Sequence, residues 1–329
     1  MTETLAQPSA EHGVPRGDRF LEQVGGAVSA AVVGAEEPLR LLATALLAEG
    51  HALVEDVPGV GKTLLARAFA ASLGLRFARV QGTPDLLPGD VTGSSILEGT
   101  SFRFVPGPVF TNVLLVDEIN RATPRTQSAL LEAMQERQVS AEGETRPLPD
   151  PFLVLATQNP IELEGTFALP EAQLDRFLLR IAIGYPDEGA ERRIAARHQA
   201  SAEPMDGVGQ VASADDVRAL REAARTVRVA EDVEQYLVAL VRATRDHDDV
   251  RLGASPRSSV ALYRAAQAWA LLDGRDFVLP DDVRALAHSV LEHRLLLDID
   301  RELRGATVAG VVDAVLEGVP LPLPADGDA

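Results

Sequence analysis

Two patterns of apolar residues divide the chain. Between residues 52 and 183, short apolar runs recur, and helical patterns separate most of them. Each run has the length of one buried strand, and the runs cover residues 52–54, 77–80, 113–116, 152–156 and 178–183. Continuous apolar runs are typical of parallel strands buried on both faces, and alternation with helices predicts a doubly wound α/β sheet.

After residue 186 the strand pattern ends and helical spacing takes over. The helical segments cover residues 187–200, 213–226, 231–245, 256–273, 280–296 and 303–317. Ser213, Ser255-Pro256 and Pro280 are typical helix starts, because they cap a first turn or occupy its first position. We therefore predict an α/β core over residues 19–184 and an all-helical domain over 185–318, with flexible tails at 1–18 and 319–329.

Composition narrows the class of protein. A length of 329 residues suggests two domains, and 31 basic against 49 acidic residues give a formal charge of −18. That charge excludes a protein whose whole surface binds nucleic acid or anionic lipid. The chain has no cysteine, which rules out disulfides and thiol nucleophiles and fits a reducing compartment. With no secretory signal and no long apolar run, we expect a soluble cytoplasmic protein.

A glycine-rich loop follows the first predicted strand. Its sequence, residues 58–63, is Pro58, Gly59, Val60, Gly61, Lys62 and Thr63, and Leu64 continues into a predicted helix. Glycines let backbone N–H groups approach phosphate oxygens, while the lysine reaches the β- and γ-phosphates and the threonine hydroxyl binds Mg²⁺. Asp56 stands where this pattern has a glycine, a departure that can change the geometry at the start of the loop. The alternative is a glycine-rich turn with a surface lysine.

Polar residues follow two later strands. Asp117 and Glu118 end the third strand, where Asp117 can hold Mg²⁺ through water and Glu118 can act as general base on an attacking water. Asn159 follows the fourth strand and can bridge that water and the γ-phosphate. Taken alone, the acids fit a solvated pair and Asn159 fits an Asn-Pro turn. Downstream of a phosphate loop, the catalytic interpretation is favoured.

Two arginines are candidates for contact with the γ-phosphate. Arg176 follows Asp175 just before the fifth strand, and Arg257 lies in the first turn of a predicted helix. An arginine from a neighbouring subunit can accelerate phosphoryl transfer by ~10³–10⁵. A structural ion pair with Asp175 is the alternative for Arg176. A cation at a helix start opposes the helix dipole, so Arg257 invites a functional explanation.

Taken together, these motifs resemble those of a known family. Residues 58–63, 113–118, 157–160, 169–177 and 255–258 resemble the Walker A, Walker B, sensor 1, arginine-finger and sensor 2 motifs of AAA+ ATPases. Four runs resemble the MoxR family more narrowly, namely residues 55–59, 84–90, 117–122 and 170–177. The resemblance extends over residues 26–297.

The resemblance implies an AAA+ P-loop core whose five parallel strands lie in the order 5-1-4-3-2, with a helical lid, ATP and Mg²⁺. It implies that Asn159 is sensor 1, that Arg176 is a finger acting in trans, and that Arg257 contacts the γ-phosphate in cis. Val33 and Gly34 would lie beside the adenine.

The resemblance also implies an assembly and a role. Inserts at residues 84–108 and 138–145 would face the central channel of a homo-oligomeric ring, usually a hexamer. Such proteins are similar to chaperones that remodel, activate or assemble partners, often ones with a von Willebrand factor A domain, so a link to membranes would run through partners only. No nucleic-acid partner is expected. Phe102, Phe104 and Phe110 either line the channel or fill a packed insert.

Two other functions stay open at this point. A nucleic-acid motor is the first, because related inserts occur in helicases, although the acidic composition disfavours it. A nucleotide-gated binding scaffold with negligible turnover is the second, and Lys62, Glu118 and Arg176 argue against it.

Overall fold

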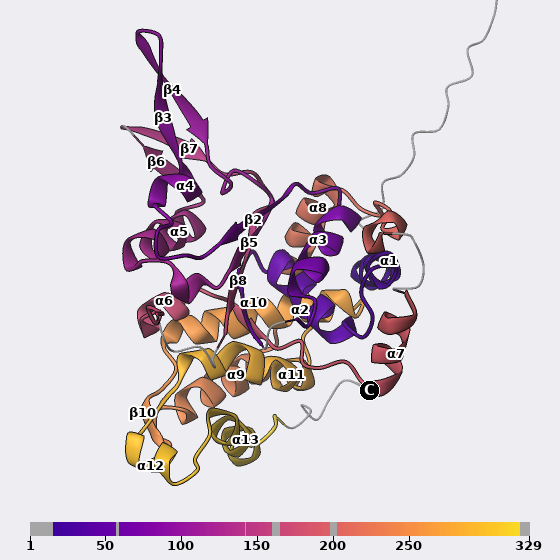
Figure 1. The fold of residues 1–329 in the computed structure, drawn as a ribbon. Coiled ribbons are helices and arrows are strands. Elements are labelled where there is room, and N and C mark those ends of the chain that lie inside the picture. Colours follow the sequence, from indigo (N-terminus) through magenta and orange to yellow (C-terminus); the bar gives the residue numbers. More distant parts are fainter. Residues whose placement is uncertain (1–15, 57–58, 142, 160–164, 198–202, 323–329) are drawn as a thin grey trace, which may run out of the picture.

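The computed structural model describes residues 16–56, 59–141, 143–159, 165–197 and 203–322. Residues 1–15 and 323–329 of the predicted tails 1–18 and 319–329 lie outside the described residues, as does Pro58 of the predicted phosphate loop. The first predicted tail extends too far, because Gly17 and Asp18 already belong to the first helix. An α/β core comes first along the chain, and a mainly helical region packs below it in the view of Figure 1.

A five-stranded parallel sheet forms the centre of the core, in the order β2-β5-β8-β1-β9. Its strands are β1 (Ala52–Glu55), β2 (Phe77–Gln81), β5 (Val113–Asp117), β8 (Leu153–Gln158) and β9 (Leu179–Ile181). Counted along the chain as strands 1 to 5, this is the predicted order 5-1-4-3-2, which is confirmed. Because all strands are parallel, their carboxyl ends share one edge of the sheet, where ligands bind in open α/β folds.

Both faces of the sheet are covered, which explains the unbroken apolar runs. Leu115 of β5 belongs to the hydrophobic cluster that contains the first helices, while its neighbour Leu114 belongs to a second cluster on the opposite face. The core helices are α1 (Gly17–Ser29), α2 (Glu36–Leu47), α3 (Lys62–Ser72), α5 (Pro124–Glu136) and the short α6 (Glu171–Leu174). A 3-10 turn, η1 (Ile119–Arg121), links β5 to α5.

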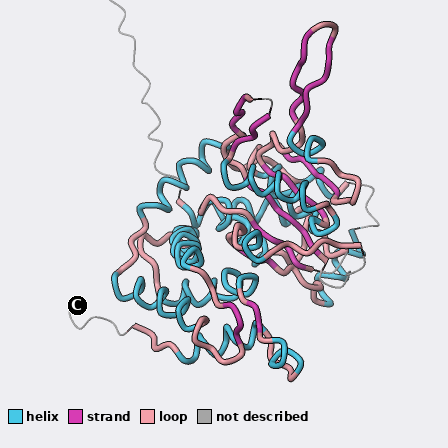
Figure 2. Tube along the Cα trace, turned by 90° about the vertical axis from the view of Figure 1, so that its left-hand side faces the viewer, coloured by secondary structure: helices cyan, strands magenta, loops and turns pink. Residues whose placement is uncertain are grey.

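Two hairpins project from one end of the core (Figures 1 and 2). The first hairpin, β3 (Gly93–Glu98) with β4 (Ser101–Pro106), follows α4 (Pro88–Thr92) and lies within the predicted insert 84–108. The second, β6 (Gln138–Ala141) with β7 (Glu144–Pro147), extends two residues beyond the predicted insert 138–145. The Phe104 ring packs edge-on against Phe110, with 5.8 Å between centroids, whereas 73% of Phe102 is exposed. Phe104 and Phe110 therefore fill the insert, and Phe102 is presented to solvent.

The lid helices follow β9. They are α7 (Glu188–Arg197), η2 (Pro204–Gly207), α8 (Ala214–Thr226), α9 (Glu231–Ala243), α10 (Pro256–Leu272), α11 (Pro280–Leu291), η3 (Glu292–Arg294), α12 (Ile299–Leu303) and α13 (Val308–Gly318). The helix predicted at 303–317 begins only at Val308, because Gly305 adopts φ +97° and interrupts it. Strands β10 (Val250–Leu252) and β11 (Leu296–Leu297) form an antiparallel ladder too short to leave an apolar run in the sequence.

The lid shares a hydrophobic cluster with the first helices of the core. Helix α10 packs against both α1 and α2, and Gly17 of α1 lies so close to α10 that an added Cβ would be 2.1 Å from the Leu271 carbonyl oxygen. Arg40 of α2 places its guanidinium 3.7 Å from the ring centroid of Trp269, a cation–π contact. Within the described residues, no helix combines the length and the apolar composition that crossing a bilayer requires.

Candidate active site

The glycine-rich loop joins β1 to α3 in the conformation that its glycines allow. Gly59 and Gly61 have φ of +88° and +90°, values that residues with a Cβ rarely adopt. Gly61 is the N-cap of α3. The first backbone N–H groups of α3 have no partner within the helix, so its N-terminus attracts anions. The sequence prediction of a strand, a glycine turn and a helix start is confirmed here.

Lys62 connects the loop with the acidic residues of β5. Its Nζ atom donates to the backbone carbonyl of Asp56 at 2.6 Å. Partial burial lowers the pKa of Lys62 from its usual value, and the nearby carboxylates of Asp56, Asp117 and Glu118 oppose that shift. The fold thus brings the predicted phosphate-binding lysine within electrostatic reach of both predicted Walker B acids.

Asp56, the departure from the phosphate-loop pattern, has a structural partner. Its buried Oδ2 atom accepts hydrogen bonds from the backbone N–H groups of Ile183 and Gly184, both at 2.6 Å. The carboxylate thereby ties the start of the loop to the segment that leaves β9 for the lid. A glycine at this position would leave both N–H groups without this acceptor.

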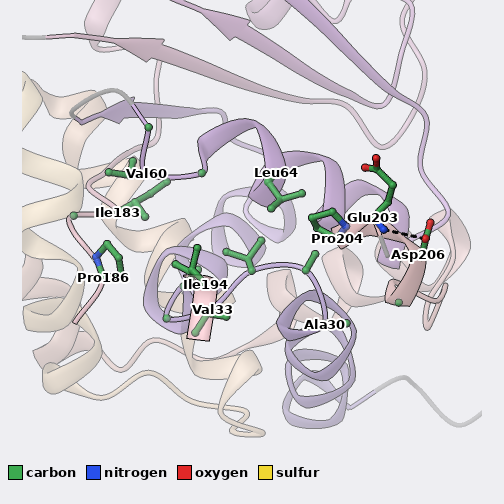
Figure 3. Close-up of a pocket in the computed structure, with 18 residues that line it drawn as sticks. Ala30, Val33, Val60, Leu64, Ile183, Pro186, Ile194, Glu203, Pro204 and Asp206 are labelled. Carbon is green, nitrogen blue, oxygen red and sulfur yellow. Dashed lines mark hydrogen bonds between the residues drawn. The ribbon is translucent and has the colours of Figure 1, made fainter. Parts of the chain in front are cut away.

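A cavity of about 800 Å³ opens beside the loop (Figure 3). Its lining includes Val33, Gly34, Gly59, Val60, Gly61, Leu64, Ile183, Gly184, Pro186, Ile194, Glu203 and Asp206. Apolar side chains surround one part of it, which suits a flat base, and the phosphate loop borders the same space. Cavities of roughly 300–1,000 Å³ are the usual size of ligand sites. The predicted neighbours of the base, Val33 and Gly34, do border this cavity together with the loop.

Thr157, at the end of β8, holds the two acids of β5 in place. Its hydroxyl accepts the backbone N–H of Glu118 at 2.9 Å and donates to Asp117 Oδ1 at 3.2 Å. Glu118 has φ +54°, a left-handed conformation that is uncommon for a residue with a side chain. Strained backbone of this kind clusters at functional sites.

Further contacts hold the carboxylates themselves. Arg79 of β2 donates to Asp117 Oδ2 at 2.6 Å, and Arg121 of η1 donates to Glu118 Oε2 at 3.0 Å. Gly82, just after β2, donates its N–H to the Asp117 carbonyl at 2.6 Å. The sequence alone assigned no role to Arg79, Arg121 or Gly82. Only the Arg121 position carried a signal, as part of the run 117–122 that resembles the MoxR family.

Thr63 and Asp117 supply the oxygen donors that Mg²⁺ prefers. Mg²⁺ usually keeps several waters and takes one or two protein ligands together with phosphate oxygens. One hydroxyl and one carboxylate match that requirement, so the residues present fit the ion. Asn159, half-buried, directly follows Gln158 at the same edge of the sheet as Asp117.

Arg176 and Arg257 lie together at a second cavity. Both line a second cavity of about 560 Å³, with Arg264, Arg294 and Asp175, and neither borders the cavity beside the loop. Arg257 Nη1 is 4.0 Å from Asp175 Oδ2. The Nε atom of Arg176 is buried and has no hydrogen-bond partner in the described part of the chain. This guanidinium nitrogen is therefore available to donate to an anion.

Comparison with known proteins agrees with this geometry. Residues 51–179 match the model of the ATPase family associated with various cellular activities (AAA), and residues 242–311 match the AAA lid domain. The chaperone MoxR1 of Mycobacterium tuberculosis is 42% identical over 328 residues, covering 96% of this chain and 86% of that protein. The chain belongs to the MoxR family of AAA+ ATPases.

Other relatives of this MoxR-family protein have the same extent. The uncharacterised protein YeaC of Bacillus subtilis is 46% identical over 298 residues, which are 90% of this chain and 93% of YeaC. A crystal structure from Cytophaga hutchinsonii, described provisionally as an ATPase, superposes with a TM-score of 0.87 at 38% identity, covering 93% of this chain and 96% of that one. The relatives therefore share both the core and the lid.

Proposed function

We propose that this MoxR-family protein hydrolyses ATP with Mg²⁺ in a ring of identical subunits, and that it uses the energy to remodel or assemble partner proteins. The observation that carries the proposal is the position of Lys62. It lies on a loop built for phosphate, beside a cavity of nucleotide size, and within electrostatic reach of Asp117 and Glu118.

Each residue of the site has a role in this proposal. Lys62 and the N–H groups at the start of α3 bind the β- and γ-phosphates. Thr63 and Asp117 hold Mg²⁺, which neutralises phosphate charge when bound. Glu118 accepts a proton from the attacking water, and Thr157 fixes the backbone that carries it. Asn159, at the same edge, orients that water against the γ-phosphate.

The second cavity supports a ring. Since Arg176 and Arg257 face a cavity separate from their own phosphate loop, we propose that both reach the nucleotide of the neighbouring subunit. For Arg257 this replaces the cis role that the resemblance implies. A head-to-tail interface that closes gives a ring, for which we propose six subunits. Hydrolysis then depends on assembly, because no subunit completes its own site.

The partners follow from the family. The relative named chaperone MoxR1 suggests protein clients, for which we propose proteins with a von Willebrand factor A domain. The hairpins β3–β4 and β6–β7, on one end of the core, would meet clients there (Figure 2). The absence of cysteine supports a cytoplasmic location.

Mixing two inactive variants tests the shared site. Lys62→Ala removes phosphate binding and Arg176→Ala removes the finger, so each protein alone should lose Mg²⁺-dependent ATP turnover. In a mixed ring, an intact Lys62 can meet an intact Arg176 from its neighbour, and random mixing should restore about a quarter of the sites. Arg103→Ala, in an exposed arginine of β4, is the matched control and should keep full turnover.

Two results would contradict the proposal. Full turnover by the Arg176→Ala protein would remove the trans finger. Absence of turnover in wild-type protein that binds ATP and assembles, as measured by light scattering, would favour the nucleotide-gated scaffold.

A further inference from the structure

A single turn of the lid contacts the core through three consecutive side chains. In η3, Glu292 pairs with Arg180 of β9, His293 Nε2 lies 3.1 Å from the Phe177 carbonyl, and Arg294 Nε donates to Asp175 Oδ1 at 2.9 Å. We call residues 292–294 the lid turn. Because these residues are adjacent, movement of the lid displaces all three contacts together.

One series of contacts, the first arm, connects the lid turn with the edge of the sheet that carries Asn159 of the same subunit. Arg180 lies between two carboxylates, those of Glu292 and of Glu55 at the end of β1. The other carboxylate oxygen of Glu55 accepts from the Gln158 side chain, and Gln158 directly precedes Asn159. Glu55 and Glu292 are 17% and 15% exposed, so water screens this chain of polar contacts only weakly.

The other arm leads to the arginine finger. The Arg294 side chain is 3% exposed, and its Nη2 donates to the Phe177 carbonyl at 2.6 Å while its Nε holds Asp175. Asp175 and Phe177 are the two chain neighbours of Arg176. Ser255 of the lid also donates to Asp175 Oδ2, at 3.1 Å. The lid thus holds the backbone on both sides of the finger.

We propose that the lid turn couples the nucleotide state of a subunit's own site to the position of the Arg176 finger that this subunit presents to its neighbour. The inference rests on the proposed function, because it requires ATP at the loop and a neighbour at the finger. Arg180, Glu292 and Arg294 are positioning residues that touch no substrate. A displacement of Asn159 is transmitted to Arg176 through Glu55, Arg180 and the lid turn. Successive subunits therefore hydrolyse ATP in a linked order.

Breaking the first arm tests the coupling without touching either nucleotide contact. Arg180→Met and Glu292→Ala each remove the bridge between β9 and the lid turn. Arg275→Met is the matched control, since Arg275 makes the same kind of ion pair, with Asp282 at 2.6 Å, entirely within the lid. For each variant, four quantities are measured: the affinity for a fluorescent ATP analogue, turnover at saturating ATP, the Hill coefficient of turnover and the melting temperature.

Wild type should hydrolyse ATP with a Hill coefficient above one. The two bridge variants should bind the analogue within about twofold of wild type, while their turnover falls at least fivefold and the Hill coefficient falls towards one, as loss of about 1 kcal/mol of coupling predicts. Glu292→Asp, which keeps the carboxylate, should retain cooperativity. The Arg275→Met control should lower the melting temperature and keep the Hill coefficient.

The coupling is overturned if the bridge variants match the Arg275→Met control in turnover and Hill coefficient, or if wild type shows a Hill coefficient of one. In that case the complementation between Lys62→Ala and Arg176→Ala still stands, so the proposed function survives. A wild-type protein without turnover overturns both. Glu292→Ala keeps the test decisive even where Arg180→Met fails to fold.

Discussion

The carboxylate of Asp56 lies 2.6 Å from the backbone nitrogen of Gly184. The same oxygen accepts the N–H of Ile183, so one side chain at the start of the phosphate loop caps the chain where it leaves β9. A residue that departs from the usual loop pattern therefore has a mechanical function: it joins the nucleotide loop to the lid connection.

Replacing Asp56 should expose that function. Asp56→Gly leaves two N–H groups without their acceptor, and we expect a loss of about 1–3 kcal/mol in the free energy of unfolding, measured with urea. Asp56→Asn keeps an accepting oxygen and should lose less. Equal stability of the glycine variant and wild type would mean that water replaces the carboxylate at no cost.

Gly82 should be essential for turnover although it touches no ligand. A Cβ at this position would lie 2.2 Å from the Glu118 carbonyl oxygen and 3.0 Å from that of Asp117. Gly82→Ala must therefore displace the end of β5, and displacement of a catalytic group by about 1 Å can cost 10²-fold in rate. Turnover at saturating ATP is the measurement.

Gly25 offers the control for this glycine substitution. It lies within α1, and an added Cβ meets nothing within 4 Å. Gly25→Ala should keep turnover and raise stability by about 0.5–1 kcal/mol, because alanine loses less backbone entropy in a helix. If Gly82→Ala behaves like Gly25→Ala, the end of β5 is more tolerant than its close contacts indicate.

His51 should make stability depend on pH. The buried ring accepts the Val154 N–H at Nδ1 and lies 3.0 Å from the Met134 carbonyl at Nε2. Burial, with help from Arg137 and Arg221, lowers the pKa of His51 to about 4, against the opposing bond to Met134. In the unfolded chain the pKa is about 6.5, so the unfolded state takes up a proton first as pH falls.

The contribution of His51 to the free energy of unfolding is complete above about pH 6.5 and declines as pH falls. Below pH 4 the decrease amounts to about 3 kcal/mol. Urea unfolding of wild type and His51→Gln at pH 7.5 and pH 5 isolates this residue from His293, whose pKa burial also lowers. Wild type should lose more stability between the two pH values than the glutamine variant does.

The two phenylalanines of β4 should differ in their effect on stability. Phe102→Ala should change the free energy of unfolding by less than about 0.5 kcal/mol, because the ring is exposed. Phe104→Ala should lower the free energy of unfolding by about 1–2 kcal/mol, because it removes two contacts of the ring. One is the edge-on contact with Phe110, and the other is the cation–π contact with the Arg146 guanidinium, 4.0 Å from the ring centroid. Equal effects in urea unfolding would mean that the hairpin is not packed as described.

Local pattern was enough to predict much of the fold. The run 113–116 predicted a buried strand because both of its faces are covered, and β5 occupies Val113–Asp117. Ser213 predicted a helix start, and its side chain caps α8 by accepting the N–H of Asp216. The ladder of β10 and β11 was missed, because strands of two and three residues form through pairing partners far apart in the chain.

The order of residues along the chain was enough to predict the chemistry: a glycine loop with Lys62 and Thr63, a strand ending in Asp117 and Glu118, and two arginines downstream. These signals are local. Each depends on the conformation of a few consecutive residues or on the burial of one strand, and both restrict which residue types follow one another in the sequence. The folded chain alone shows that Arg257 lies with Arg176 near Asp175, that Thr157 and Gly82 hold the acids, and that Asp56 binds the chain beyond β9. Those relationships join segments distant in sequence, and packing places them there rather than any pattern along the chain.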